Sequence, residues 1–523
     1  MAEWWKTGII YQIYPRSFQD SDGDGIGDLN GIRRRLPYLA ELGVQAVWIS
    51  PIFVSPMADF GYDIADYTGI EPMFGTMADF EALVAEAHGL GLKIILDLVP
   101  NHTSDQHDWF RESRSSRENP KRDWYIWRDG RDGGPPNNWI SNFGGSAWAW
   151  DEATGQYYYH AFLAGQPDLN WRNPEVRAAM HDVLRFWLDR GVDGFRVDVI
   201  WHLMKDPDLR DNPENPAYMP NQPDISRLLQ EHSADHPDVH DVIVELRRVV
   251  DEYDERVLIG EIYLPLDRLM AYYGRDLDET HLPFNFQLLQ TAWNARDVAR
   301  VVEEYEAALP PGGWPNWVLG NHDQPRIAAR VGEEQARVAA MLLLTLRGTP
   351  TMYYGDEIGI GRVAIPPDRV QDPWEKNEAG LGFGRDPQRT PMQWDRSAHA
   401  GFSTAEPWLP LAEDWPMRNV AALSGNQQGI LSLYRTLVRL RQEHPALVLG
   451  SYEAVTVTDQ VLVFARTAGD ERLVVALNFS GQRQTVTLPQ AGLTPLCSTA
   501  SMPLQPFGSA ELTLEPNEGL ILA

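Results

Sequence analysis

The chain has 523 residues, of which 43% are hydrophobic, enough for a large buried core. Its net charge is −29, from 74 acidic and 45 basic side chains, and no basic run is present, which excludes nucleic acids and anionic membrane surfaces as expected partners. With one cysteine, no apolar signal stretch at the N-terminus and no apolar run of membrane-spanning length, we expect a cytoplasmic protein without an intrachain disulfide.

Short apolar runs of strand length alternate with helical patterns along most of the chain. Nearly continuous apolar strands are typical of a parallel sheet that is buried on both faces. The expected strands cover residues 8–14, 45–49, 92–98, 194–199, 257–263, 317–319 and 350–354. Because each is followed by a helical pattern, the chain is predicted to form a parallel sheet or barrel with right-handed crossovers.

Two of the intervening helices have recognisable ends in the sequence. Thr76 is suited to cap a helix that Gly91 ends. Asn173, followed by Pro174, begins another helix that ends at Gly191. These boundaries support the alternation of strands and helices.

Two regions interrupt the alternation. Residues 103–170 are rich in Trp, Gly, Pro, Asn and Asp and are too long for an ordinary connection, which predicts an inserted subdomain. Its stretch from Trp124 to Trp150 is polar and glycine-rich, so we do not expect these rings to form a core. From about residue 448 onward, helical patterns give way to short alternating runs, which predict a small antiparallel β-domain.

Polar side chains stand where several of the expected strands end: His102, Asp198, Glu261 and Asp323. In a barrel of alternating strands and helices the carboxyl ends of the strands meet on one face, so these groups are expected to converge. A single carboxylate at a strand end is usually a helix cap, but three of them with neighbouring histidines and arginines are not all explained as caps.

These segments resemble the α-amylase superfamily of glycoside hydrolases, and within it the oligosaccharide α-glucosidase and oligo-1,6-glucosidase branch. The matching motifs run in the family's order from residue 5 to about 447. They are Asp97–His102, Gly194–Asp198, Ile259–Glu261 and Asn321–Arg326, with further matches at Tyr11–Phe18, Gly61–Ile64, Gln166–Asn170 and Arg389–Trp394.

The resemblance implies an α/β fold with three parts. A (β/α)8 TIM barrel is expected from residues 1–102 and 171–447, with subdomain B at 103–170 inserted after the third strand. Residues 448–523 are expected to form a C-terminal antiparallel β-sandwich.

The resemblance also implies a retaining, exo-acting α-glucosidase that releases terminal glucose from short α-gluco-oligosaccharides by double displacement. Asp198 would be the nucleophile, Glu261 the acid and base, and Asp323 the group that steadies the transition state. Arg196 shares a strand face with Asp198 and would keep it ionised and oriented. Further substrate contacts are expected from Tyr62, Asp63, His102, Phe143, Phe162, His322 and Arg389. Among these, Asp63 and Arg389 are expected to clamp the hydroxyls farthest from the scissile bond.

Residues 20–28 alternate oxygen ligands with glycines, a spacing that suits a hard cation such as Ca²⁺ and also fits a solvated acidic turn. The segment lacks the glutamate that ends an EF-hand loop. The resemblance implies a structural Ca²⁺, or Mg²⁺, held by Asp20, Asp22, Asp24, the carbonyl of Ile26 and Asp28. No organic cofactor is expected.

The substrate stays open at this stage. Val199 is similar to the residue at this place in α-1,6-cleaving members, whereas Trp201 departs from the oligo-1,6-glucosidase pattern, which usually has asparagine there. The alternatives are an oligo-1,6-glucosidase, or an α-glucosyltransferase or a sucrose or trehalose isomerase with the same three carboxylates. A catalytically silent relative is disfavoured because these carboxylates are retained. We expect a small oligosaccharide as partner, bound by a monomer or small homo-oligomer.

Overall fold

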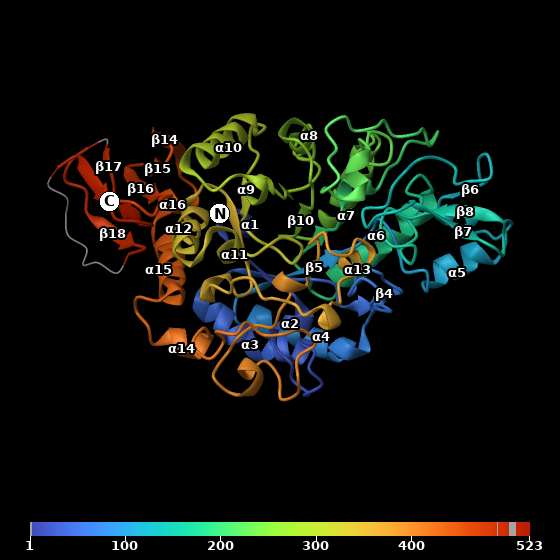
Figure 1. The fold of residues 1–523 in the computed structure, drawn as a ribbon, viewed down its shortest axis with the longest axis horizontal. Coiled ribbons are helices and arrows are strands. Elements are labelled where there is room, and N and C mark those ends of the chain that lie inside the picture. Colours follow the sequence, from blue (N-terminus) through green and yellow to red (C-terminus); the bar gives the residue numbers. More distant parts are fainter. Residues whose placement is uncertain (1–2, 489, 501–508) are drawn as a thin grey trace.

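The computed structural model describes residues 3–488, 490–500 and 509–523. Eight parallel strands form one sheet, in the order β11-β10-β9-β5-β2-β1-β13-β12, that curves into a nearly closed barrel (Figure 1). The strands are β1 (Ile10–Ile13), β2 (Ala46–Ile49), β5 (Lys93–Leu98), β9 (Gly194–Val197), β10 (Val257–Gly260), β11 (Leu282–Pro283), β12 (Asn316–Val318) and β13 (Thr349–Tyr353). The predicted barrel is confirmed. The sequence predicts each of these strands except β11, which is two residues long and has no periodic signal.

Side-chain hydrogen bonds join the two edge strands of the sheet, β11 and β12. The side chain of Asn316 on β12 donates from Nδ2 to the carbonyl of Pro283 on β11 at 2.5 Å. Its Oδ1 accepts the amide N–H of Asn285 at 2.9 Å. Asn316 is fully buried, so these bonds occupy both polar ends of an amide that would otherwise be costly to bury. One asparagine therefore links the two edge strands of the sheet.

Helices surround the barrel and bury their apolar faces against it (Figure 1). Thr76 forms a capping box with Asp79 at the start of α4, as its sequence position predicts. Asn173 caps α6, and Gly43 ends α3 with φ 91°, where a side chain would be strained. The main helices of this layer are α3 (Leu29–Leu42), α4 (Met77–Gly89), α6 (Pro174–Leu188), α7 (Val239–Val250), α8 (Leu266–Ala271), α10 (Ala295–Ala308), α12 (Glu333–Thr345) and α15 (Ile430–Glu443).

The segment between β5 and α6 forms a small unit with a core of its own. It contains α5 (Asp108–Ser115) and an antiparallel sheet of β6 (Trp127–Arg128), β8 (Gln156–Tyr159) and β7 (Trp148–Asp151). The expectation that its tryptophans are not core residues is wrong: Trp139 and Trp148 are buried in an apolar cluster with Tyr159. Trp150 is the exception, with 46% of its surface exposed.

The C-terminal part is antiparallel, as predicted, and lies at the opposite end of the molecule from the inserted segment (Figure 1). One sheet has the order β14 (Ser451–Val457), β15 (Val461–Ala468), β16 (Glu471–Asn478), β20 (Gly519–Leu522) and β18 (Pro495–Ser498). A second pairs β17 (Gln484–Thr487) with β19 (Glu511–Leu514). Apolar side chains from both sheets form one buried cluster between them.

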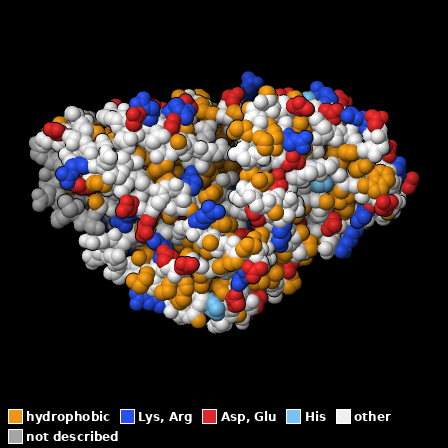
Figure 2. Space-filling view, in the orientation of Figure 1, with side chains coloured by type: hydrophobic (Ala, Val, Ile, Leu, Met, Phe, Trp, Pro, Cys, Tyr) orange, Lys and Arg blue, Asp and Glu red, His pale blue; other side chains and the backbone are white. Residues whose placement is uncertain are grey.

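Charged side chains of both signs are interspersed over the face shown in Figure 2, without a broad basic patch. Among the described residues, none of the helices combines the length and hydropathy that a bilayer-spanning segment requires.

Candidate active site

A pocket of about 510 Å³ lies where the barrel strands end. Asp198 directly follows β9 and Glu261 directly follows β10, so both reach the face of the barrel where catalytic groups gather. The pocket brings together seven of the expected residues: Asp198, Glu261, Asp323, Tyr62, His102, Phe143 and Phe162.

Arg196 is fully buried and holds the carboxylates without lining the pocket. It lies on β9 beside Asp97 of the neighbouring strand β5. Its Nη1 donates to Asp97 at 2.7 Å and to Asp198 at 2.8 Å, and its Nη2 lies 2.7 Å from Oε2 of Glu261. Burial would lower the pKa of Arg196, but these carboxylates outweigh it and raise the pKa well above its ordinary value.

The backbone after Asp198 also holds Glu261. The amide N–H of Val199 donates to Oε2 of Glu261 at 2.9 Å. Val199 has φ 37° and ψ 46°, a left-handed conformation that β-branched residues rarely adopt. Such strain persists only where the surrounding structure enforces it, and here it directs the amide toward the carboxyl group of Glu261.

Asp198 and Glu261 both contact the guanidinium of Arg196, and both are almost fully buried. Burial raises the pKa of both carboxyl groups above their ordinary values. The charge of Glu261 raises the pKa of Asp198 further, while Arg196 opposes the rise in both. Two neighbouring buried carboxyl groups do not both ionise readily, which favours the retention of a proton by the pair.

Asp323, in contrast, is held in its ionised form. Burial opposes its charge, but the guanidinium groups of Arg385 and Arg389 outweigh burial and hold the pKa of this carboxyl well below its ordinary value. Arg389 donates to Oδ1 of Asp323 at 2.8 Å and Arg385 at 3.2 Å. Burial lowers the pKa of His322 well below its ordinary value, so the imidazole 3.2 Å from Asp323 is neutral at neutral pH.

Asp63 does not line the pocket, which differs from its expected role as a substrate clamp. Its carboxylate accepts hydrogen bonds from Ser55 Oγ and Asp59 N, both at 2.9 Å, and from Ala58 N at 2.8 Å. These bonds shape the turn, and Asp59 is the aspartate of this turn that lines the pocket. Sequence alone does not separate two aspartates four residues apart in an irregular segment.

Arg389 is also fully buried outside the pocket lining, and Arg385 lines the pocket in its place. Arg385 Nη2 lies 2.8 Å from Asp59 and 2.7 Å from Asp372, and its Nη1 lies 3.2 Å from Asp323. Burial would lower the pKa of Arg385, but these carboxylates raise it well above its ordinary value. The Asp59–Arg385 pair is thus a charged, buried part of the wall next to Asp323.

The inserted segment supplies an aromatic part of the wall. The rings of Phe143 and Phe162 lie 5.7 Å apart, and Phe162 lies 5.2 Å from His102. Burial lowers the pKa of His102 to about 4, so its ring is neutral at neutral pH. Gln166 of the same segment reaches His102 Nε2 and Asp59 Oδ2, both at 3.3 Å.

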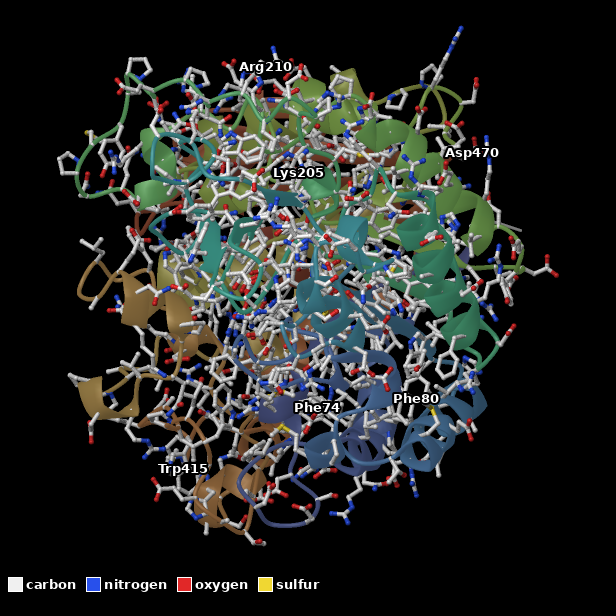
Figure 3. The ribbon with its side chains drawn as sticks, turned by 90° about the vertical axis from the view of Figure 1, so that its right-hand side faces the viewer. Phe74, Phe80, Lys205, Arg210, Trp415 and Asp470 are labelled. Carbon is white, nitrogen blue, oxygen red and sulfur yellow. The ribbon has the colours of Figure 1, made fainter. Side chains whose placement is uncertain are left out.

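A buried lysine near the pocket was not among the predicted site residues. Lys205 is 4% exposed, and its Nζ lies 2.8 Å from Asn101 and 2.5 Å from Asp168. Figure 3 shows it within the molecule, whereas Arg210 lies at the edge. These contacts join the segments after β5 and β9 to the inserted segment, and no local sequence pattern predicts them.

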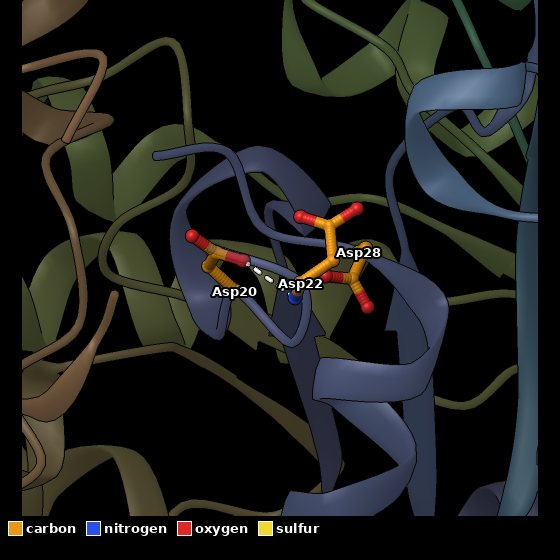
Figure 4. Close-up of side chains that lie close together, drawn as sticks. All are labelled: Asp20, Asp22 and Asp28. Carbon is orange, nitrogen blue, oxygen red and sulfur yellow. Dashed lines mark hydrogen bonds between the residues drawn. The ribbon is translucent and has the colours of Figure 1, made fainter. Parts of the chain in front are cut away.

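The acidic loop places three of its five expected ligands together. Carboxylate oxygens of Asp20, Asp22 and Asp28 lie within 4.8 Å of one another (Figure 4). Asp24 is not part of this group, and its carboxylate accepts the N–H of Ile26 at 2.8 Å. Burial and the neighbouring carboxylates raise the pKa of Asp28. An all-oxygen, like-charged donor set of this kind fits a hard divalent cation.

Of two neighbouring carboxyl groups, one can protonate a glycosidic oxygen while the other attacks the anomeric carbon. Here two such carboxyl groups lie on a (β/α)8 barrel, with a third, ionised carboxylate beside them. This arrangement defines a glycoside hydrolase. Residues 12–450 match the family described as alpha amylase, catalytic domain, and residues 450–495 match the alpha-amylase C-terminal domain. The chain therefore belongs to the α-amylase family.

The chain is also similar to individual proteins of this family. The chain is 43% identical to a probable alpha-glucosidase of Rhizobium meliloti (strain 1021), over 94% of this chain and 92% of that protein. It is 41% identical to an oligo-1,6-glucosidase of Parageobacillus thermoglucosidasius, over 93% and 92%. Among solved structures, an alpha-glucosyl transfer enzyme superposes with a TM-score of 0.94 at 39% identity, covering 100% of this chain and 99% of that one. The trehalulose synthase of Pseudomonas mesoacidophila MX-45 has a TM-score of 0.92 at 37% identity, with coverages of 100% and 99%.

Proposed function

We propose that the protein is a retaining, exo-acting α-glucosidase that releases terminal glucose from short α-glucosides. The observation that supports this most is that one guanidinium, that of Arg196, contacts both Asp198 and Glu261, at 2.8 Å and 2.7 Å. Retaining enzymes place their two carboxyl groups about 5–5.5 Å apart, whereas inverting enzymes leave roughly 6.5–9.5 Å for a water molecule. Two carboxylates bound to the two terminal nitrogens of one guanidinium fit the shorter, retaining spacing.

The proposed reaction has two displacements at the anomeric carbon. The ionised carboxylate of Asp198 attacks this carbon while Glu261 donates its proton to the departing glycosidic oxygen, which forms a glucosyl ester on Asp198. Glu261 then takes a proton from water, whose oxygen attacks the anomeric carbon and breaks the ester bond. Glucose leaves with its original configuration, and the pair again holds one proton.

The exo action is proposed from the charged end of the pocket. Asp59 and Arg385 form a buried ion pair next to Asp323 and offer charged partners to the hydroxyls of one terminal glucosyl unit. A wall of this kind leaves no path for a longer chain beyond that unit. The metal group of Asp20, Asp22 and Asp28 is proposed to be structural, because none of its residues lines the pocket.

A second candidate is transfer of the glucosyl unit to a sugar, because relatives of near-identical fold include an alpha-glucosyl transfer enzyme and a trehalulose synthase. The two functions share the glucosyl ester and differ in whether water or a sugar hydroxyl attacks it. Incubation with maltose or sucrose distinguishes them: hydrolysis yields free glucose, and transfer yields rearranged disaccharides.

The nucleophile assignment is tested with Asp198→Asn and 4-nitrophenyl α-glucoside. Turnover should vanish while the circular dichroism spectrum and melting temperature stay close to those of the wild type, because the amide keeps the shape of the carboxylate. The anomer first released by the wild type, followed by NMR, should be α-glucose. Near wild-type turnover of the variant, or β-glucose as first product, would refute the proposal.

A further inference from the structure

His322 lies behind two residues that line the pocket, Tyr62 and Asp323, and does not line the pocket itself. Its side chain is 1% exposed. The imidazole is stacked on the ring of Tyr62, 5.4 Å away with 3° between the planes. Its Nε2 lies 2.6 Å from the hydroxyl oxygen of Tyr62 and 3.2 Å from Oδ2 of Asp323. The position of the imidazole proton therefore affects both of these pocket residues.

The chemistry of the neighbours places this proton on Nε2. Burial lowers the pKa of His322 well below its ordinary value, so the ring is neutral and only one of its nitrogens carries a proton. Asp323 is ionised and can only accept hydrogen bonds. A bare Nε2 would place its lone pair 3.2 Å from this carboxylate, whereas a protonated Nε2 donates toward it.

The hydroxyl group of Tyr62 agrees with the same tautomer. Tyr62 donates its own O–H to Oδ2 of Asp97 at 3.1 Å. Its oxygen is then able to accept the proton of His322 Nε2. Asp97 accepts a hydrogen bond from Arg196 at 2.7 Å, and Arg196 also donates to Asp198. A chain of hydrogen bonds thus joins the imidazole to the guanidinium that holds the proposed nucleophile.

The other imidazole nitrogen, Nδ1, is bare in this tautomer and is satisfied by Gln12. Gln12 lies on β1 and is fully buried, and its Nε2 lies 2.8 Å from Nδ1 of His322. The same amide nitrogen lies 3.4 Å from Oγ of Ser50, a hydroxyl that can donate or accept and so does not select an orientation. Among the described residues, Oε1 of Gln12 has no hydrogen-bond partner, so the imidazole orients this amide.

The remaining groups around His322 do not supply a donor to Nδ1. The rings of Tyr14 and Trp48 lie 5.8 Å and 6.2 Å from the imidazole. Arg389 donates to the backbone carbonyl of His322 at 2.9 Å, not to its ring. The charged groups that act on the pKa of the imidazole are Asp323, which raises it, and Arg389, Arg196 and Arg385, which lower it.

We propose that Gln12 is a positioning residue of the active site: it fixes the proton of His322 on Nε2 and thereby holds Tyr62 and Asp323 in their working arrangement. The proposal rests on the proposed α-glucosidase activity and adds a residue that acts from outside the pocket. An amide suits this role because it donates to Nδ1 without bringing a charge into the barrel. An ionised carboxylate at the same place can only accept, so it demands the opposite tautomer.

The variant Gln12→Glu tests the tautomer, because it keeps the size of the side chain and reverses its hydrogen-bonding role. When ionised, the new carboxylate accepts a proton from Nδ1 and leaves Nε2 bare against Asp323. At lower pH the new carboxyl group and His322 together take up one further proton, which restores the proton on Nε2. The ratio of kcat/KM for 4-nitrophenyl α-glucoside, variant over wild type, should therefore lie below about one-tenth at about pH 8 and rise at least about threefold by about pH 5.

Gln12→Met separates this pH effect from the loss of the hydrogen bond alone. Methionine removes the donor without adding an ionisable group, so the kcat/KM ratio should fall by about tenfold, as one lost hydrogen bond to a buried group allows, and stay constant over the same pH range. Gln335→Glu is the matched control. Gln335 is a buried glutamine, 8% exposed, whose amide donates to the carbonyl of Asn478 at 3.1 Å, and it does not line the pocket. Its kcat/KM ratio should stay near one at every pH.

A kcat/KM ratio for Gln12→Glu that stays flat, or falls as pH decreases, would overturn the positioning proposal while the glucosidase function stands. Near wild-type kcat/KM for Gln12→Met would overturn it as well, because Nδ1 would then need no donor. A rise in Gln335→Glu equal to that in Gln12→Glu would show that any buried carboxyl group has this effect. If circular dichroism shows that Gln12→Met does not fold, the pH profile of Gln12→Glu decides. If the wild type hydrolysed no α-glucoside, the proposed function and the role of Gln12 would fall together.

Discussion

Replacing Asp59 and, separately, Asp63 by asparagine tests which aspartate of this turn serves the substrate. Asp59 lines the pocket, and its Oδ1 lies 2.8 Å from Arg385 Nη2. Asparagine keeps the shape but removes the charge that would bind glucosyl hydroxyls. A hydrogen bond to a charged group contributes about 1.5–3 kcal/mol, so kcat/KM should fall by about 10- to 150-fold. The fold should survive, because Arg385 keeps Asp372 at 2.7 Å.

Asp63→Asn should act on stability. The wild-type carboxylate accepts three hydrogen bonds, one on Oδ2 and two on Oδ1. In either orientation the amide places its NH2 group against at least one backbone N–H, and a buried donor without an acceptor costs about 1–3 kcal/mol. The free energy of unfolding should fall by that amount, and kcat/KM should change less than threefold.

Both variants are compared above pH 7, because burial raises the pKa of Asp63 to about 6 and the wild-type group must be ionised. Glucose release from maltose gives kcat/KM, and urea unfolding followed by tryptophan fluorescence gives stability. If Asp63→Asn lost activity as strongly as Asp59→Asn at unchanged stability, the assignment of Asp59 to the pocket would be wrong.

Two further predictions concern buried or clustered acids elsewhere. Chelation with EDTA should lower the melting temperature more than the initial rate, because Asp20, Asp22 and Asp28 would repel one another without a cation, and added Ca²⁺ should reverse the change. A lost rate at unchanged melting temperature would instead indicate a catalytic metal. Burial raises the pKa of Asp356 to about 7, so the folded state holds a proton that the unfolded state releases near pH 4. The stability of the wild type relative to Asp356→Asn should therefore fall as pH rises from about 4 to 7, by at most about 1.4 kcal/mol per pH unit, and level off above; unfolding curves across this range that showed the opposite slope would contradict it.

The barrel is predictable from sequence because its strands are buried on both faces and form continuous apolar runs. Closure of the barrel is not predictable in the same way. It depends on β11, with two residues, and on the side chain of Asn316, whose partners come from another segment. The burial of the tryptophans in the inserted segment is not predictable for a related reason. Trp139 and Trp148 pack against each other in a segment without regular periodicity.

The residues of the candidate site also differ in how well the sequence predicts their positions. Asp198 and Glu261 follow strands directly, so strand register alone places them together above Arg196. Asp59 and Arg385 lie in irregular segments, where spacing from a motif does not determine which side chain turns inward. The sequence expectation of Asp63 and Arg389 selected the motif residues, whereas the structure places the neighbours four positions earlier in the pocket.

This difference between residues on strand ends and residues in irregular segments has a chemical consequence. The groups proposed to cleave the bond, Asp198 and Glu261, are held on strand ends by a guanidinium and a strained backbone amide, so their geometry follows from the barrel itself. Other residues that line the pocket, among them Trp201 and Leu229, lie in a short η helix and a loop that the barrel does not dictate. Substitutions in those segments can therefore change the wall of the pocket while the contacts of Asp198 and Glu261 with Arg196 stay in place. Relatives of this fold named as hydrolases and as glucosyl transfer enzymes are consistent with that separation.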